Sequence, residues 1–236
     1  MISIGNLSKS YGKNKALDSI NLTLTTGIFA LLGPNGAGKS TLMNILTLGL
    51  DYDSGTVTWN EKTIEEAGRD YRAILGYMPQ QQGLYDGFRG IDFLRYMAGL
   101  KAIPKKQIDI ETERVADLVN LSDRMLDRLS EYSGGMKQRI LLAAAVIGDP
   151  KLIILDEPTA GLDPKERIRV REIVKSMAGE KIIIFATHVV SDIETIADEV
   201  ILLKKGVIAD KSDPADLCNR YSVPDLESVY MKVFGE

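Results

Sequence analysis

A glycine-rich segment that ends in lysine, serine and threonine is the part of this sequence best suited to chemistry. It reads Gly33-Pro34-Asn35-Gly36-Ala37-Gly38-Lys39-Ser40-Thr41 and fits the P-loop pattern G-x-x-x-x-G-K-[ST]. The three glycines allow positive φ and a close approach of the backbone to a ligand. Consecutive N–H groups then turn inward at the start of the following helix, where the helix dipole favours phosphate oxygens. The segment predicts a nucleoside triphosphate site, with Lys39 on the β- and γ-phosphates and the Ser40 hydroxyl on Mg²⁺.

Two adjacent carboxylates supply a second chemical group. Asp156 and Glu157 directly follow the apolar run 152–155 and precede Pro158-Thr159. An acidic residue at the end of a buried strand beside a P-loop is suited to holding Mg²⁺, which we assign to Asp156. Glu157, one residue later, points elsewhere and is a candidate general base for an attacking water.

A third group, Ser133-Gly134-Gly135, precedes a helix expected over residues 136–147. A hydroxyl and free N–H groups at a positive helix end form a second anion site. The alternative is an N-cap serine followed by a flexible hinge. A second γ-phosphate site in a chain with one P-loop makes sense if it serves the nucleotide of another subunit.

Together with Gly161-Leu162-Asp163 and His188, these segments resemble the ordered motifs of an ATP-binding cassette (ABC) ATPase, over about residues 1–210. The resemblance implies that two such domains, two copies or two homologous subunits, pack head to tail around two ATP molecules. Two positions depart from the family's common Leu-Ser-Gly-Gly-Gln signature, since Tyr132 replaces the leucine and Met136 the glutamine.

The resemblance also assigns roles to individual residues. Tyr11 would stack on adenine, Gln80 would sense Mg²⁺ and the γ-phosphate, and Asp163 would lie in the loop that crosses the dimer interface. His188, the one histidine of the chain, would contact the γ-phosphate and the attacking water. Tyr11 as an exposed turn aromatic and His188 as a structural histidine are the alternatives. With Lys39 and Glu157, His188 completes the set of candidate catalytic residues.

Apolar runs predict the strands that position these groups. Residues 28–32, 152–155, 182–186 and 200–203 are continuously apolar, as in parallel strands that are covered on both faces. Helical segments near 164–178 and 191–198 separate the last three of these runs. Residues 1–24 alternate, with a turn at Lys9–Gly12, and further strands are expected over 56–60 and 73–78.

Residues 83–150 show helical periodicity instead, with loops at Gly99-Leu100, at Pro104 and over 130–135. The predicted fold class is therefore α/β: a P-loop NTPase core of mostly parallel sheet, an N-terminal antiparallel β subdomain and an inserted helical subdomain. We expect one domain over 1–236. Its core and β subdomain comprise 1–82 and 151–210, its helical subdomain 83–150, and its short helical tail 211–236.

The composition of the chain limits its possible binding partners and its cellular location. A net charge of −4 argues against binding nucleic acid, which needs a basic face. The longest apolar run, residues 140–147, is far too short to span a bilayer, and the single cysteine, Cys218, cannot form an internal disulfide. We expect a cytoplasmic protein that reaches the membrane through a partner.

The resemblance implies the ATPase subunit of a membrane transporter with a separate permease. Residues 84–88 and the short helical insert resemble bacterial exporter ATPases, and import is the alternative direction. Soluble ABC ATPases of translation or DNA maintenance are a different class, but they carry two cassettes or long coiled coils, whereas Gly38 and Ser133 are close in this sequence. A small-molecule kinase or switch GTPase would not need Ser133-Gly134-Gly135.

The permease is expected to dock near residues 84–100. In the helix predicted over 91–100, polar or small residues occupy one narrow stripe, at 92, 95 and 99. The remaining apolar arc is wider than one packed face needs and suggests a groove for a cytoplasmic helix of the permease. It contains Phe93, Leu94, Tyr96, Met97 and Leu100. The alternative is that the whole arc is core.

Overall fold

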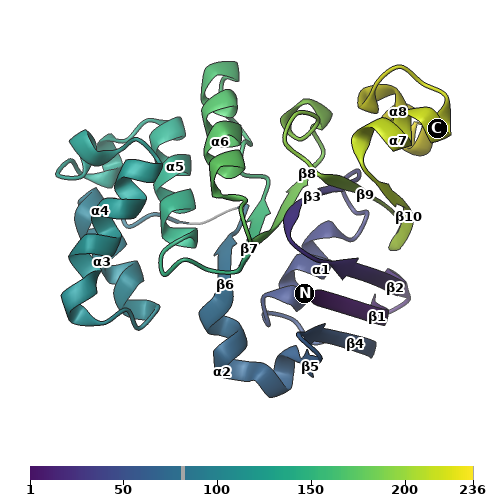
Figure 1. The fold of residues 1–236 in the computed structure, drawn as a ribbon, viewed down its shortest axis with the longest axis horizontal. Helices are drawn as coiled ribbons and strands as arrows, with labels where there is room; N and C mark the ends of the chain where they lie inside the picture. Colours follow the sequence, from purple (N-terminus) through teal and green to yellow (C-terminus); the bar gives the residue numbers. More distant parts are fainter. Residues whose placement is uncertain (81–82, 236) are drawn as a thin grey trace.

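The computed structural model describes residues 1–80 and 83–235, and its central feature is a six-stranded sheet ordered β10-β9-β3-β8-β7-β6 (Figure 1). The strands are β3 (Gly27–Leu32), β6 (Leu75–Met78), β7 (Leu152–Asp156), β8 (Ile182–Thr187), β9 (Glu199–Lys204) and β10 (Val207–Ser212). Neighbours from β9 to β6 are parallel, and β10 is antiparallel to β9. The continuous apolar runs are thus the buried parallel strands that the sequence predicts.

The register of this sheet brings three strand ends together. Leu32 at the end of β3 pairs with Thr187 at the end of β8, and Asp156 at the end of β7 pairs with Ala186. Open α/β sheets bind ligands outside the carboxyl ends of their strands. The P-loop, the two adjacent carboxylates and His188 all follow directly from these ends.

A second, antiparallel sheet has the order β2-β1-β4-β5. Its strands are β1 (Ile2–Tyr11), β2 (Asn14–Leu24), β4 (Ser54–Trp59) and β5 (Lys62–Thr63). Helix α1 (Lys39–Leu46) lies between the two sheets, and its apolar residues share one core with residues of β1, β2 and β3. The turn predicted at Lys9–Gly12 is wrong in position, because β1 continues to Tyr11 and the hairpin turns at Gly12 and Lys13.

Helices α3 (Gly90–Leu100), α4 (Ile108–Leu118) and α5 (Gly134–Ala145) pack on one another at one end of the molecule, the left in Figure 1. Short 3₁₀ segments η1 (Lys105–Gln107), η2 (Ser122–Arg124) and η3 (Leu129–Glu131) connect them. The loop expected at Gly99-Leu100 is instead the last turn of α3. The proposed boundary between core and helical region, at 82 and 83, falls partly outside the described residues.

Helix α2 (Ile64–Ile74) was not predicted, and the strand expected from residue 73 begins only at Leu75. A capping box between Thr63 and Glu66 starts this helix. The buried Tyr71 anchors it, because its hydroxyl donates a 2.7 Å hydrogen bond to the carbonyl of Leu46 at the end of α1. A local cap and a tertiary contact together therefore stabilise this helix.

The segment expected as a helix over 191–198 is also different. Only a single 3₁₀ turn forms there, η4 (Val190–Asp192). The buried apolar residues Val190, Ile193 and Ile196, of which only Val190 belongs to η4, are three positions apart, a spacing that a 3₁₀ turn accommodates. Helix α6 (Pro164–Met177) matches its prediction, and α7 (Pro214–Tyr221) and α8 (Leu226–Phe234) form the helical tail. Within the described residues, no helix combines the length and apolar character needed to cross a bilayer.

Candidate nucleotide site

The P-loop curves tightly at the start of α1. Gly38 is the N-cap residue with φ of 112°, and a Cβ there would lie 2.6 Å from the carbonyl oxygen of Ala16. Gly36 also has positive φ, but the prediction of positive φ for Gly33 is wrong. Gly33 is required for another reason, since a Cβ there would lie 2.3 Å from the carbonyl oxygen of Leu203 in β9.

A hollow of about 460 Å³ lies over this loop and gathers most of the predicted site residues. Those lining it are Tyr11, Pro34, Asn35, Gly36, Gly38, Lys39, Ser40, Thr41, Gln80, Asp156 and Glu157. Tyr11 stands at the end of β1 with half of its surface exposed. Sequence reasoning missed four lining residues, Asn14, Lys15, Ala16 and Lys205. They come from the β1–β2 hairpin and the β9–β10 turn, and no local motif marks either turn as part of a site.

Lys39 lies buried at the base of the hollow. Its ammonium group donates hydrogen bonds to the carbonyl oxygens of Gly33, at 2.5 Å, and Pro34, at 3.3 Å. Burial lowers the pKa of Lys39, while the nearby Glu157 and Asp156 carboxylates act in the opposite direction. The arrangement therefore holds a cation where phosphate oxygens would enter the loop.

Asp156 carries the most perturbed carboxyl of the hollow. Burial, and then repulsion from Glu157, raise its pKa from 3.8 to about 6, against the attraction of Lys39. Ser40, Gln80 and Asp156 line the same hollow and all offer oxygen atoms. These residues fit Mg²⁺, which takes oxygen ligands and needs only one or two protein carboxylates when phosphates supply the others. The described residues contain no cluster of three or more His, Cys, Asp or Glu suited to a metal.

Glu157 and His188 form a direct pair. The Glu157 carboxylate is 5% exposed, and its Oε1 lies 2.8 Å from His188 Nδ1. A carboxylate only accepts hydrogen bonds, so His188 Nδ1 is the donor in this pair. Thr187, which the sequence analysis did not single out, donates from its hydroxyl to Glu157 Oε2 at 3.2 Å. Glu157 itself has a φ of 49°, and its N–H bonds to the carbonyl of Ala186.

The remaining predicted residues lie outside this hollow. Ser133 is exposed and caps α5, because its hydroxyl accepts a hydrogen bond from the N–H of Met136. Gly134 lines a second hollow between α5 and the loop after β7, and Gln80 lines both hollows. Gly135 packs against α6, since a Cβ there would lie 2.6 Å from Glu166 Oε2. Asp163 caps α6 in the same way that Ser133 caps α5. The buried Ala37 belongs to the P-loop but does not line the hollow.

Comparison with known proteins agrees with the resemblance to ABC ATPases seen in the sequence. Residues 17–160 match the family described as ABC transporter. The uncharacterized ABC transporter ATP-binding protein YxlF of Bacillus subtilis is 35% identical over 92% of this chain and 72% of its own length. The lantibiotic transport ATP-binding protein SrtF of Streptococcus pyogenes is 37% identical over 88% of this chain and 89% of its own.

Solved structures agree on the fold. A dimeric structure of a post-hydrolysis state of the ATP-binding cassette MJ0796, bound to ADP and Pi, superposes with a TM-score of 0.79 at 23% identity. The match covers 90% of this chain and 98% of that one. The fold and the site define a P-loop nucleotide-binding ATPase. The chain belongs to the ABC transporter family, as one of its ATP-binding proteins.

Replacing Asp156 by Asn tests the cost of the buried charge. The pKa of Asp156 is about 6 in the folded protein, above its value in the unfolded chain. At a pH below the unfolded-chain pKa the carboxyl is protonated in both states and costs no folding free energy. As the pH rises through about 6 the buried group becomes charged, and the folded protein loses stability. In buffer with a metal chelator and no nucleotide, Asp156→Asn should gain roughly 1–3 kcal/mol of unfolding free energy at about pH 8. The gain should shrink toward about pH 4.5.

Thermal and urea unfolding at both pH values measure this difference. Asp51→Asn, a change at an exposed carboxyl, is the matched control and should show no comparable dependence on pH. A destabilised Asp156→Asn at alkaline pH would contradict the assignment of a costly buried charge.

Proposed function

We propose that this protein is the ATP-hydrolysing subunit of an exporter, working as a head-to-tail dimer that drives a separate membrane permease. The observation that carries the proposal is the division of the predicted residues. Lys39, Asp156 and Glu157 share one hollow, whereas Ser133 is exposed outside it. A site that lacks its second phosphate contact within one chain is completed by a second copy or a homologous subunit.

In this proposal the P-loop N–H groups and Lys39 bind the phosphates, and Tyr11 stacks on the adenine. Ser40, Gln80 and Asp156 hold Mg²⁺, which neutralises charge between the phosphates when bound. Glu157 accepts a proton from the attacking water. His188 orients Glu157 through the 2.8 Å hydrogen bond and presents Nε2 toward the γ-phosphate and the water.

The partner chain would complete the site with Ser133 and Gly134, whose hydroxyl and N–H groups lie at the exposed start of α5. Asp163 would cross the same interface. The departure at Tyr132 does not disturb this surface, because the tyrosine is buried and its hydroxyl donates a 2.8 Å hydrogen bond to the carbonyl of Arg124. The similarity to MJ0796, whose structure is dimeric, supports this arrangement.

Changing Glu157 to Gln tests the hydrolytic role. The variant should bind ATP but lose roughly 10²–10⁴-fold in turnover, because the amide cannot take the proton from water. It should also accumulate as an ATP-bound dimer. Steady-state ATPase assays and size-exclusion chromatography measure both effects, and near-normal turnover would remove Glu157 from the role of base.

The composite site makes a separate prediction. Ser133→Arg should stop hydrolysis without weakening nucleotide binding to the dilute monomer, because the arginine would clash with the partner's nucleotide. Lys39→Ala, in contrast, should fail to bind ATP within its own chain. A fluorescent nucleotide distinguishes the two variants, and an equal loss of binding in both would place Ser133 and Lys39 in the same site.

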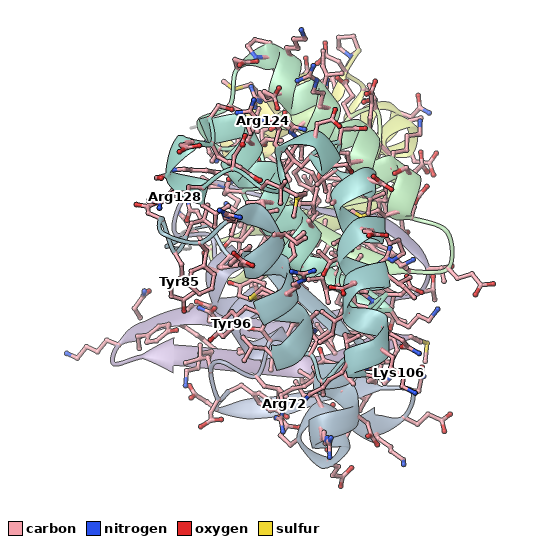
Figure 2. The ribbon with its side chains drawn as sticks, turned by 90° about the vertical axis from the view of Figure 1, so that its left-hand side faces the viewer. Arg72, Tyr85, Tyr96, Lys106, Arg124 and Arg128 are labelled. Atoms are coloured by element: carbon pink, nitrogen blue, oxygen red, sulfur yellow. The ribbon has the colours of Figure 1, made fainter. Side chains whose placement is uncertain are left out.

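An aromatic cluster supports a permease contact near residues 84–100. Tyr85, Phe88 and Tyr96 are exposed, and their ring centroids lie 5.2 to 6.1 Å apart. Figure 2 shows Tyr85 and Tyr96 together on the face formed by α3. The predicted apolar arc is therefore split, because Phe93 and Leu94 are fully buried. Exposed, clustered aromatic side chains are suited to anchoring a helix of another subunit.

Membership of a transporter family, and the similarity to SrtF, support export and a place on the cytoplasmic face of the membrane through the permease. The double change Tyr85→Ser and Tyr96→Ser should abolish co-purification with the co-expressed permease while the melting temperature stays near normal. Ile110→Ser, at an exposed residue of α4, is the matched control. Unchanged co-purification of the double variant would move the docking surface elsewhere.

A further inference from the structure

Asp192 is a buried carboxylate that the proposed hydrolytic mechanism does not use. It belongs to η4, is 1% exposed and does not line the nucleotide hollow. Its Oδ2 accepts a 2.6 Å hydrogen bond from the Thr159 hydroxyl and a 2.7 Å bond from Arg167 Nη2 in α6. Burying a charge is costly unless it is paired and hydrogen-bonded. These contacts therefore join η4 firmly to the segment that contains Thr159 and to α6.

The two segments that Asp192 joins are the ones that carry Glu157 and His188. Thr159 follows Glu157 by two residues in the loop after β7, and Asp192 follows His188 by four in the loop after β8. Both segments are tightly turned. The N–H of Ala160 bonds to the carbonyl of Glu157, and the N–H of Asp192 to that of Val189. Two side-chain hydrogen bonds consequently link the loops: Glu157–His188, in which Glu157 lines the hollow, and Thr159–Asp192, whose residues do not line it.

The helical tail also contacts η4. Val190 and Ile193 share a core with Leu226, Val229 and Val233 of α8. Arg171 of α6 also donates a hydrogen bond to the carbonyl of Ser191. Thus η4 is packed against α8 and bonded to α6, and the Thr159–Asp192 bond transmits this rigidity to the turn that contains Glu157.

We propose that Asp192 is a positioning residue for hydrolysis. It holds the two loops at the separation at which Glu157 and His188 meet, so that both reach the same water. The inference rests on the proposed roles of Glu157 and His188. A misplaced reacting group can cost about 10²-fold in rate even when the change lies away from the chemistry.

Asp192→Ala should therefore lower kcat for ATP by about 10- to 100-fold, while KM stays within about twofold because Asp192 lies outside the binding hollow. Asp192→Asn keeps an acceptor oxygen and should recover part of kcat. The matched control is Glu194→Gln, two residues further on at an exposed carboxylate, which should leave both constants unchanged.

Thr159→Val provides a second variant that keeps the shape of the side chain and removes only the hydroxyl. It should lower kcat in the same direction, and combining it with Asp192→Ala should cost less than the two separate losses together, because both variants remove the Thr159–Asp192 hydrogen bond. If Asp192→Ala does not fold, this variant decides the question. Melting temperatures are measured alongside, to separate loss of stability from loss of turnover.

A normal kcat in Thr159→Val and in Asp192→Ala, with only a lowered melting temperature, would overturn the inference and leave Asp192 a structural residue. A raised KM with unchanged kcat would also overturn it. Failure of the proposed function gives a different result. If the proposed function is wrong, Glu157→Gln itself retains turnover. If only the inference about Asp192 is wrong, Glu157→Gln is inactive and the Asp192 variants are active.

Discussion

Burial of the neighbouring carboxylates Asp156 and Glu157 opposite Lys39 is the constraint on which the site depends. Both carboxylates are at least nine-tenths buried, and the pKa of Asp156 is raised to about 6. The pKa of Lys39 is lowered in turn by burial. A site that keeps charges of both signs out of water is prepared for a ligand that brings its own compensating charges. A polyphosphate with a divalent cation is such a ligand.

Strand pairing brings these charged residues together, and hydrogen bonds between the loops fix the positions of their side chains. Parallel pairing of β3, β8 and β7 sets the P-loop, His188 and the two carboxylates side by side. The loops then add the Glu157–His188 pair and the Thr159–Asp192 bond. A residue can combine a structural role with a proposed functional one: Ser133 caps α5, and its exposed surface is the proposed contact with the partner's nucleotide.

The sequence predicted the parallel strands because each is a continuous apolar run, and the P-loop because its pattern is local. It did not predict α2, which is polar overall, contains a left-handed Gly68 and is held by Tyr71 on α1. Thr187 and Asp192 were missed because their importance arises only from the adjacency of β7 and β8. Likewise, the apolar arc of α3 divides into core and exposed cluster according to its neighbours, which the periodicity of α3 alone cannot specify.

The central claim is that the site is shared between two chains, because within one chain Lys39 lines the nucleotide hollow whereas the exposed Ser133 lies outside it. The most direct measurement is the ATPase rate per subunit as a function of protein concentration, at saturating ATP and Mg²⁺. A site shared between two chains predicts that the rate per subunit rises with concentration and then reaches a plateau. A rate per subunit that is constant from the most dilute to the most concentrated sample, with the protein shown to be monomeric throughout, would contradict it.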